Sequence, residues 1–265
     1  MSALRFARIL FGLMVVFFLL APLTAILPLA FTDSVFLNYP IQTYSTRWFD
    51  ELFVSEVWRR SIVNSLIIGC GTTLLATVLG TLGALGLRRQ SSSWLFSFVR
   101  TAFLLPMVVP AVVLGVGMQL MFARYNLTNS YLGVIIAHTV VAVPFVVVNV
   151  LAVLQAIDPR LEQAAASLGA SPPTVLRRVT LPLAFPGIAS GAVFAFATSL
   201  DEVVLTLFVA GPNQRTLARQ MFSSIRENIS PAIAAAAFLF IVGTVLVAVL
   251  LHLWRNSPRL RTAPR

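Results

Sequence analysis

The sequence predicts an all-α membrane protein with six transmembrane helices, and both its composition and its apolar runs point to that fold. Hydrophobic residues make up 58% of the 265-residue chain and charged residues 11%, whereas an average soluble protein has roughly 45–50% and about 25%. Six apolar runs are each long enough for the roughly 20 helical residues that cross a hydrocarbon core of about 30 Å. This composition excludes a soluble globular enzyme.

The six predicted helices are long and almost free of charge, and they lie near residues 9–31, 62–87, 101–123, 132–154, 186–210 and 232–254. The first run is longer than the apolar part of a cleaved signal peptide, about 7–15 residues, so we interpret it as a retained helix. The connecting segments are too short for a soluble domain. Residues 1–265 are therefore expected to form a single transmembrane domain, with a cytoplasmic loop over 155–185.

Glycine and proline within these runs favour a packed bundle. Gly80, Gly83 and Gly86 in the second predicted helix allow neighbouring backbones to approach closely in lipid. Pro106 and Pro110 are expected to bend the third predicted helix, because proline removes a backbone hydrogen bond.

The ionisable residues exclude several chemistries. All 19 basic residues are arginine, so the chain has neither the lysine of a Walker A loop nor a Schiff-base lysine. One cysteine (Cys70) and two histidines (His138 and His252) leave no disulfide framework and no metal site. The arginines are scattered between apolar runs, which is not the pattern of a nucleic-acid-binding protein. We expect no metal, no cofactor and no nucleic acid.

Arginine placement predicts that both termini are cytoplasmic, because cytoplasmic loops carry an excess of positive charge. With the N-terminus inside, the outer segments hold Arg47, Arg59, Arg60, Arg124, Arg215, Arg219 and Arg226. The inner segments then hold the larger group, Arg5, Arg8, Arg88, Arg89, Arg100, Arg160, Arg177, Arg178, Arg255, Arg259, Arg261 and Arg265.

The loop between the fourth and fifth predicted helices has the pattern of two short helices joined by a glycine. The Ala-rich stretch after Asp158 favours a helix, and Gly169 suits its C-cap. Pro172 can begin a second helix, which Pro182 is expected to end. The apolar face of this element has no lipid to bury against, so we expect a protein partner to cover it.

This loop resembles the EAA loop of binding-protein-dependent ABC importer permeases, in which Glu-Ala-Ala is followed by Gly and, thirteen residues later, by Pro. Gly169 and Pro182 have that spacing, and Gln163 occupies the position of the family's Glu. The resemblance implies that the loop docks into an ATPase subunit, with the charged contact shifted to Glu162 or lost. The coupling residues it implies are Glu162, Gln163, Ala164, Ala165, Leu168, Gly169 and Pro182.

The same resemblance implies a type I ABC importer (MetI-like) permease fold in a bacterial inner membrane. Its implied partners are membrane lipid, a dimer of ATP-binding ABC ATPases, a second, non-identical permease and an external substrate-binding protein. ATP hydrolysis would then reside on the ATPase chains, so this chain is expected to be a transport subunit and not an enzyme.

Four further segments resemble the polyamine branch of these permeases, in its second permease subunit of the spermidine/putrescine type. They are residues 105–110, 199–203, 208–212 and 216–223. The resemblance implies import of a polyamine or a related amine. Ala111 stands where polyamine permeases often carry an acid, so amino-acid derivatives and phosphonates stay open as substrates.

Asp201 and Glu202 are the acids of the fifth predicted helix. An acid within a membrane costs at least about 2.5–3.5 kcal/mol, so it normally faces a cavity or a partner. We expect these two residues as candidates for the translocation path, where a carboxylate attracts a cationic solute. The alternative is a buried acid that accepts hydrogen bonds from nearby hydroxyl groups, and we favour it for Glu202.

The remaining polar residues favour structural roles, and the other functions have less support in the sequence. His138 and His252 are read as packed or interfacial residues and not as proton relays. Arg215 and Arg219, one helical turn apart, form either a solvated face or a contact to the binding protein. The alternative function is an ion-coupled secondary transporter that uses Asp201 or Glu202, which the lack of a clear inverted repeat disfavours. An intramembrane enzyme has no constellation of residues to support it.

Overall fold

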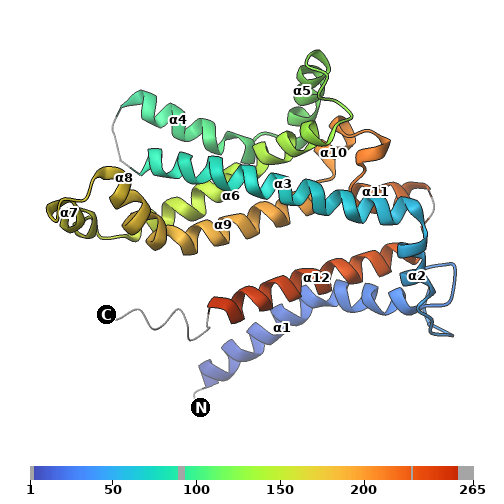
Figure 1. Ribbon diagram of the computed structural model, residues 1–265. Coiled ribbons are helices and arrows are strands. Elements are labelled where there is room, and N and C mark those ends of the chain that lie inside the picture. The colour runs from blue at the N-terminus through green and yellow to red at the C-terminus, as the bar shows by residue number, and fades with distance from the viewer. Residues whose placement is uncertain (1–2, 89–92, 228, 256–265) are drawn as a thin grey trace. The chain divides into compact units, whose positions relative to one another are not determined.

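The computed structural model describes residues 3–88, 93–227 and 229–255, and this part of the chain is helical almost throughout (Figure 1). The predicted all-α class is confirmed. Within the described residues the extended pairing is limited to one isolated bridge, between Thr32 and Tyr44. Four arginines of the orientation prediction, Arg89, Arg259, Arg261 and Arg265, lie outside the described residues. The chain divides into two compact units, Met1–Arg59 with Met221–Arg265, and Arg60–Gln220.

The first unit contains α1 (Ala3–Ile26), η1 (Leu27–Phe31), α2 (Arg47–Val54) and α12 (Ala232–Arg255). Three aromatic rings join the last three of these elements. Phe31, Phe49 and Phe238 lie with ring centroids 5.1–5.6 Å apart, tilted or edge to face. Aromatic pairs of this geometry stabilise a fold by more than the burial of their apolar area alone would. In contrast, α1 exposes large apolar side chains on all sides.

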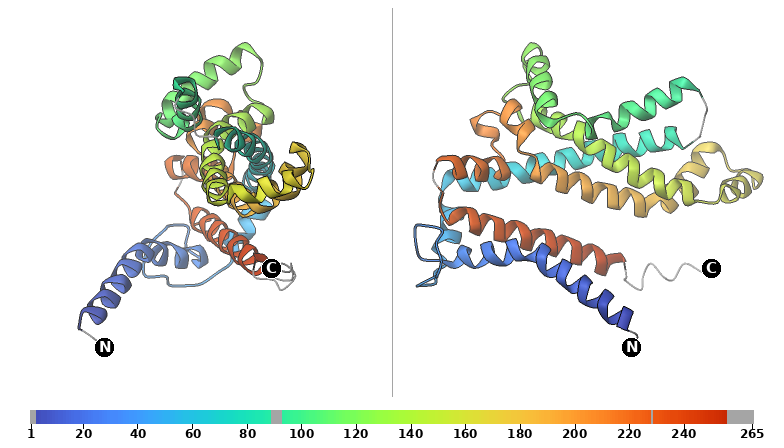
Figure 2. Two further views of the ribbon diagram at one scale, coloured as in Figure 1. Left: turned by 90° about the vertical axis from the view of Figure 1, so that its left-hand side faces the viewer. Right: turned by 180° about the vertical axis from the view of Figure 1, so that it is seen from behind.

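The second unit holds the remaining helices, with α3 and α11 continuing across the unit boundary. The elements are α3 (Glu56–Leu87), α4 (Trp94–Leu104), η2 (Leu105–Met107), α5 (Ala111–Arg124), α6 (Tyr131–Ala156), α7 (Pro159–Ser167), α8 (Pro172–Val175), η3 (Leu176–Thr180), α9 (Leu181–Asp201), α10 (Val204–Val209), η4 (Pro212–Gln214) and α11 (Leu217–Glu227). The helices α7 and α8 lie at one end of this unit and α10 lies at the other (Figures 1 and 2).

Helix α6 is the centre of the second unit, and it packs side by side with α9 (Figures 1 and 2). Its residue Val146 is fully buried between two glycines from different helices. A Cβ atom added at Gly80 of α3 would lie 2.6 Å from the Val146 Cβ, and one added at Gly191 of α9 would lie 3.1 Å from the Val146 Cα. Glycine at both positions therefore allows the close helix approach expected in lipid.

Several helices have the length and composition of membrane spans. Four described segments qualify alone: Arg5–Phe31, Glu56–Leu87, Tyr131–Ala156 and Pro172–Asp201. The pair Trp94–Met107 and Ala111–Arg124 adds a fifth if its two helices form one bent span, and Ala232–Leu246 is a shorter apolar helix.

Two predicted helices differ in detail from the structure. The third was expected to bend at its prolines, and this is confirmed, because α4 with η2 meets α5 at an angle of 102°. That run begins earlier than expected, at Trp94. The fifth was expected as one helix over 186–210, whereas α9 ends at Asp201 and α10 begins at Val204. The predicted fifth helix is thus interrupted beside Asp201 and Glu202.

Candidate functional site

The cytoplasmic loop of the sequence prediction folds as a helix, a glycine turn and a second helix. Asp158 caps α7 by accepting a hydrogen bond from the Arg160 N–H at 2.9 Å. At the other end, the Gly169 N–H donates to the Ala166 carbonyl at 2.9 Å, and the Ala170 N–H donates to the Ala165 carbonyl at 3.2 Å. These two bonds form a Schellman motif, in which the residue after the cap takes a left-handed conformation. Gly169 does so with φ +85°.

The prediction that Pro182 ends the second helix is wrong. Pro172–Asp201 forms one helical segment, in which the π-helical turn Leu176–Thr180 directly precedes α9. Pro182 stands in the first turn of α9. Proline lacks the N–H that would bond to the previous turn, and wider π turns accommodate such interruptions within a helix. The second helix of the loop is therefore continuous with a predicted membrane span.

The predicted coupling residues, which lie on α7, in the turn after it and on α9, differ in exposure. Gln163, Ala164, Leu168 and Gly169 are exposed, and the Leu168 side chain reaches 90% exposure. Ala165 and Glu162 are partly covered by the rest of the chain, and Pro182 is exposed on α9. An isolated leucine at such exposure gains free energy if a partner covers it, because apolar burial yields about 25 cal/mol per Å².

Glu162 is bound within its own chain. Its Oε1 atom accepts a hydrogen bond from the Thr180 hydroxyl at 2.5 Å. The same atom forms an ion pair with the guanidinium group of Arg88, the residue that follows α3. Burial alone would raise the pKa of Glu162, but the hydrogen bonds from Thr180 and Arg88 and the charge of Arg88 outweigh it and lower the pKa. The carboxylate therefore stays ionised at neutral pH.

The two membrane acids lie at the break between α9 and α10. Glu202 Oε1 accepts a hydrogen bond from the Leu205 N–H at 2.9 Å, so this carboxylate caps the first turn of α10. Asp201 is the last residue of α9 and is exposed. Among the described residues its carboxylate has neither a hydrogen bond nor an ion pair to another side chain. The two adjacent acids thus have different surroundings.

The break is held by His138, whose role the sequence did not show. His138 of α6 is fully buried, with Nδ1 2.9 Å from the Ser199 hydroxyl and Nε2 3.0 Å from the Thr206 hydroxyl. Thr206 donates its own proton to the Glu202 carbonyl at 2.9 Å. We therefore assign the neutral tautomer with the proton on Nε2, so that Nδ1 accepts from Ser199. One imidazole ring thereby joins α6, α9 and α10.

A second polar network lies at the same end of the unit. Asn64 of α3 donates to the carbonyls of Asn213 and Arg215 at 2.8 and 2.9 Å, and it accepts from the Tyr131 hydroxyl at 2.7 Å. Arg219 donates to the carbonyls of Thr206 and Ala210 at 3.1 and 2.8 Å. Arg219 therefore satisfies carbonyls at the end of α10, and it is not simply part of a solvated face.

Comparison with known proteins identifies the family. The model for the binding-protein-dependent transport system inner membrane component matches residues 76–257. The chain belongs to this permease family. Among curated relatives, the spermidine/putrescine transport system permease protein PotC of Escherichia coli (strain K12) is 29% identical to this chain. The alignment covers 88% of this chain and 87% of PotC. PotI of the same strain, a putrescine transport system permease protein, is 34% identical over 86% and 83%.

Other members of the family differ in the solute that they are named for. The molybdenum transport system permease protein ModB of Mycobacterium bovis is 33% identical over 82% of the permease and 89% of its own length. Among solved structures, a bacterial alginate ABC transporter in complex with a pentasaccharide-bound periplasmic protein aligns with a TM-score of 0.71 and 21% identity. That alignment covers 98% of the permease and 96% of the matched chain.

These findings confirm the predicted type I ABC importer permease fold and the importer function. They do not support the ion-coupled secondary transporter. The family explains why the chain has the features of a transport subunit and not of an enzyme.

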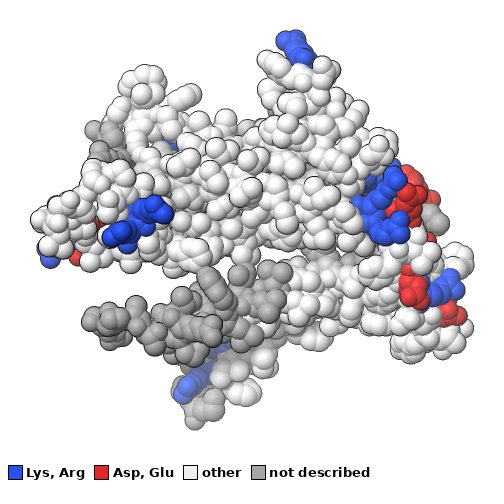
Figure 3. Space-filling view, viewed as in Figure 1, with Lys and Arg blue, Asp and Glu red and all other residues white. Residues whose placement is uncertain are grey.

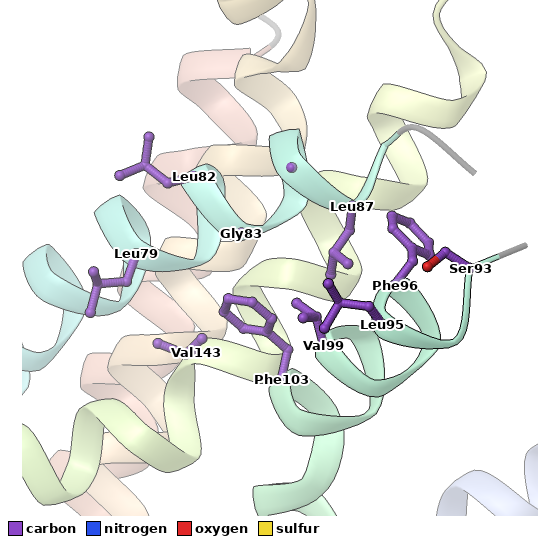
Figure 4. A pocket seen from close by; sticks show the side chains of 11 residues that line it. Leu79, Leu82, Gly83, Leu87, Ser93, Leu95, Phe96, Val99, Phe103 and Val143 are labelled. Carbon is purple, nitrogen blue, oxygen red and sulfur yellow. The ribbon is translucent and has the colours of Figure 1, made fainter. Parts of the chain in front are cut away.

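A cavity between three helices of the second unit does not have the character of a solute site. It has a volume of about 760 Å³ and lies between α3, α4 and α6 (Figure 4). Ser93 is its one hydroxyl side chain, and the other lining residues, such as Leu82 and Phe103, are apolar or glycine. Sites for polar ligands combine an apolar wall with a few convergent polar groups. This cavity lacks such groups, and the described residues contain no cluster suited to a metal ion.

The distribution of charge in the second unit agrees with a membrane span. In Figure 3, charged side chains lie at the end that carries α7 and α8 and, in a larger group, at the opposite end near the start of α3, while a broad uncharged surface lies between the two ends. Arg160, Arg177 and Arg178 are the exposed basic residues of the α7–α8 end. Charge at the ends and apolar surface between them is the pattern of a permease surrounded by lipid.

Proposed function

We propose that this chain is one of two permease subunits of an ATP-driven importer for a polyamine or a related amine. The observation that carries the proposal is the similarity to PotC and PotI, each covering more than four fifths of both chains. The partners of the proposed importer are an ABC ATPase dimer, a second permease and an external substrate-binding protein. The proposed location is a bacterial inner membrane, with both termini in the cytoplasm.

The exposed face of α7 supports the ATPase as a partner. Gln163, Ala164 and Leu168 are all exposed there, and the Schellman turn at Gly169 fixes where the next helix begins. A short helix with small side chains and an exposed leucine is suited to insertion into a cleft of another protein, because few long side chains lose conformational freedom on binding. The ATPase would therefore dock on this face of α7.

The end of α9 supports a cationic solute. The C-terminal end of a helix carries a partial negative charge that favours cations, and the exposed Asp201 carboxylate adds a full charge at that end. Glu202 contributes less, because it caps α10. We assign to Asp201 the role of attracting the ammonium group of the solute, and to Glu202 the role of holding the break in shape.

The experiment is purification of the full chain from its native membrane in mild detergent, followed by mass spectrometry of the bound proteins. An ABC ATPase, a second permease and a binding protein are the expected partners. The recovered binding protein is then tested for thermal stabilisation by spermidine, putrescine and molybdate. Stabilisation by an amine supports the assigned solute, and stabilisation by molybdate alone overturns it. Recovery of the chain without an ATPase, while other membrane complexes stay intact, would overturn the importer assembly.

A further inference from the structure

The tie between α7 and the rest of the chain is concentrated in one carboxylate. In the part of the chain that the structure describes, the side-chain hydrogen bonds that join α7 to another helical element are those of Glu162, to Arg88 and to Thr180. Arg88 follows α3, and Thr180 is the last residue before α9. One oxygen atom thus links three segments that are far apart in the sequence.

We propose that Glu162 is a positioning residue that latches α7 to the ends of α3 and α9, so that a displacement of α7 moves both helices. This inference rests on the proposed docking of an ATPase on α7. It differs from the role expected from the sequence, in which Glu162 itself would contact the ATPase. In the structure that carboxylate is turned toward its own chain, while the neighbouring Gln163 is exposed.

The surroundings of the pair favour a durable link. The side chains of Arg88 and Glu162 are only 19% and 27% exposed, so solvent and salt screen their interaction less than they screen a surface pair. Hydrogen bonds between charged groups are roughly twice as strong as those between neutral groups. Thr180 is 3% exposed and is anchored in the helical segment that continues as α9. A bound α7 cannot tilt freely while these contacts persist.

Helix α9 connects the latch at Glu162 and Thr180 with the acids Asp201 and Glu202. Helix α9 extends for 21 residues from Leu181 to Asp201, so the latch lies just before one end of this helix and Asp201 lies at the other. Helix α9 packs side by side with α6, so a displacement of the end near the latch is carried toward Asp201. Without the latch, the short connections of α7 to α6 and α8 would absorb the movement of a docked ATPase.

The variants that test the latch change charge with little change in volume. Glu162→Gln keeps an acceptor for Thr180 but removes the ion pair, and Arg88→Glu reverses the partner. The double variant E162R/R88E exchanges the two charges. Arg100→Gln is the matched control, because it changes one charge at an exposed position of α4 outside the loop. If Arg88→Glu does not reach the membrane, Thr180→Val removes the hydroxyl donor and takes its place.

Two measurements are made on the complete importer, purified with its partners. The first is the rate of tryptic cleavage after Arg177 and Arg178, which every variant retains, scored bond by bond so that the new trypsin site at position 162 of the charge-exchange variant is not counted. The second is the amount of solute imported per ATP hydrolysed, with retention of the ATPase as a check on docking. We expect Glu162→Gln to raise the cleavage rate about tenfold and to lower import per ATP about tenfold. A tenfold effect is within the usual range of coupling between two sites of a protein. Arg100→Gln should leave both measurements unchanged.

The charge exchange decides between a latch and simple structural damage. Recovery of slow cleavage and of coupled import in E162R/R88E supports the latch, because a merely structural defect would add up in the double variant. Parental behaviour of Glu162→Gln would overturn it, as would loss of the ATPase from that variant, which would make Glu162 a docking residue. If the parent protein shows no ATP-driven import, the proposed function fails, and the cleavage series still tests the latch by itself.

Discussion

The left-handed turn at Gly169 allows a quantitative prediction about docking. No other atom lies within 4 Å of a Cβ added at Gly169, so a side chain there meets no clash and acts through the backbone alone. A left-handed conformation costs an L-amino acid roughly 1–2 kcal/mol, and a β-branched residue is affected most. In a variant at position 169, the loop of the free permease relaxes to a negative φ, and the docked ATPase requires φ near +85° again. The cost of the left-handed conformation then appears in full in the free energy of docking.

We therefore expect Gly169→Val to weaken ATPase binding by about 5- to 30-fold, because each 1.4 kcal/mol is about a factor of ten in affinity. Gly169→Asn should weaken it much less, since asparagine tolerates the left-handed region. Gly86→Ala is the control, because Gly86 of α3 also has open space around its Cβ but has no positive φ. The assay is titration of labelled ATPase onto the detergent-purified permease. Equal affinities of the Val and Asn variants would refute the backbone argument.

Four further outcomes test other parts of the structure. Gly80→Val places a Cβ 2.6 Å from a valine Cβ of α6, so it should destabilise the fold by about 1–3 kcal/mol and lower the melting temperature in detergent, unlike Gly117→Ala. His138→Phe removes the acceptor of the buried Ser199 hydroxyl at a cost of about 1–3 kcal/mol, while Thr206 keeps its bond to the Glu202 carbonyl; an unchanged melting temperature would contradict the Ser199 contact. Asp201→Asn should lower amine uptake by about fivefold, as a charged hydrogen bond is replaced by a neutral one, without a change in melting. The lowered pKa of Glu162 means that its ion pair stabilises the fold at neutral pH and loses that effect as the pH falls through the folded-state pKa, so the melting temperatures of the parent and Glu162→Gln should converge in acid.

The coupling loop could be predicted from the sequence because its signals are local. An alanine-rich stretch, a glycine and a proline specify a helix, its cap and the start of the next helix within fifteen residues. The structure reproduces this order from Asp158 to Pro172. Pro182 misled the prediction, because a rule for proline within a regular α-helix does not anticipate the π turn before it.

The break at the acids and the ion pair of Glu162 could not be predicted in the same way. The run 186–210 is apolar enough to suggest one helix, and the two sides of its interruption are joined by His138, more than sixty residues earlier. Arg88 and Glu162 are likewise separated by 74 positions. In both cases the deciding contact is tertiary, and no periodic pattern in the chain reports it.

The packing around Val146 has a consequence for how sequences of this fold can diverge. Because its side chain lies against Gly80 on one side and Gly191 on the other, its volume limits two helix spacings at once. A larger residue at either glycine position would be tolerated only with a smaller residue at 146, which would in turn loosen the opposite contact. We therefore expect these three positions to change together among descendants of this chain. The two glycines do not need to contact each other to be coupled, because each of them contacts Val146.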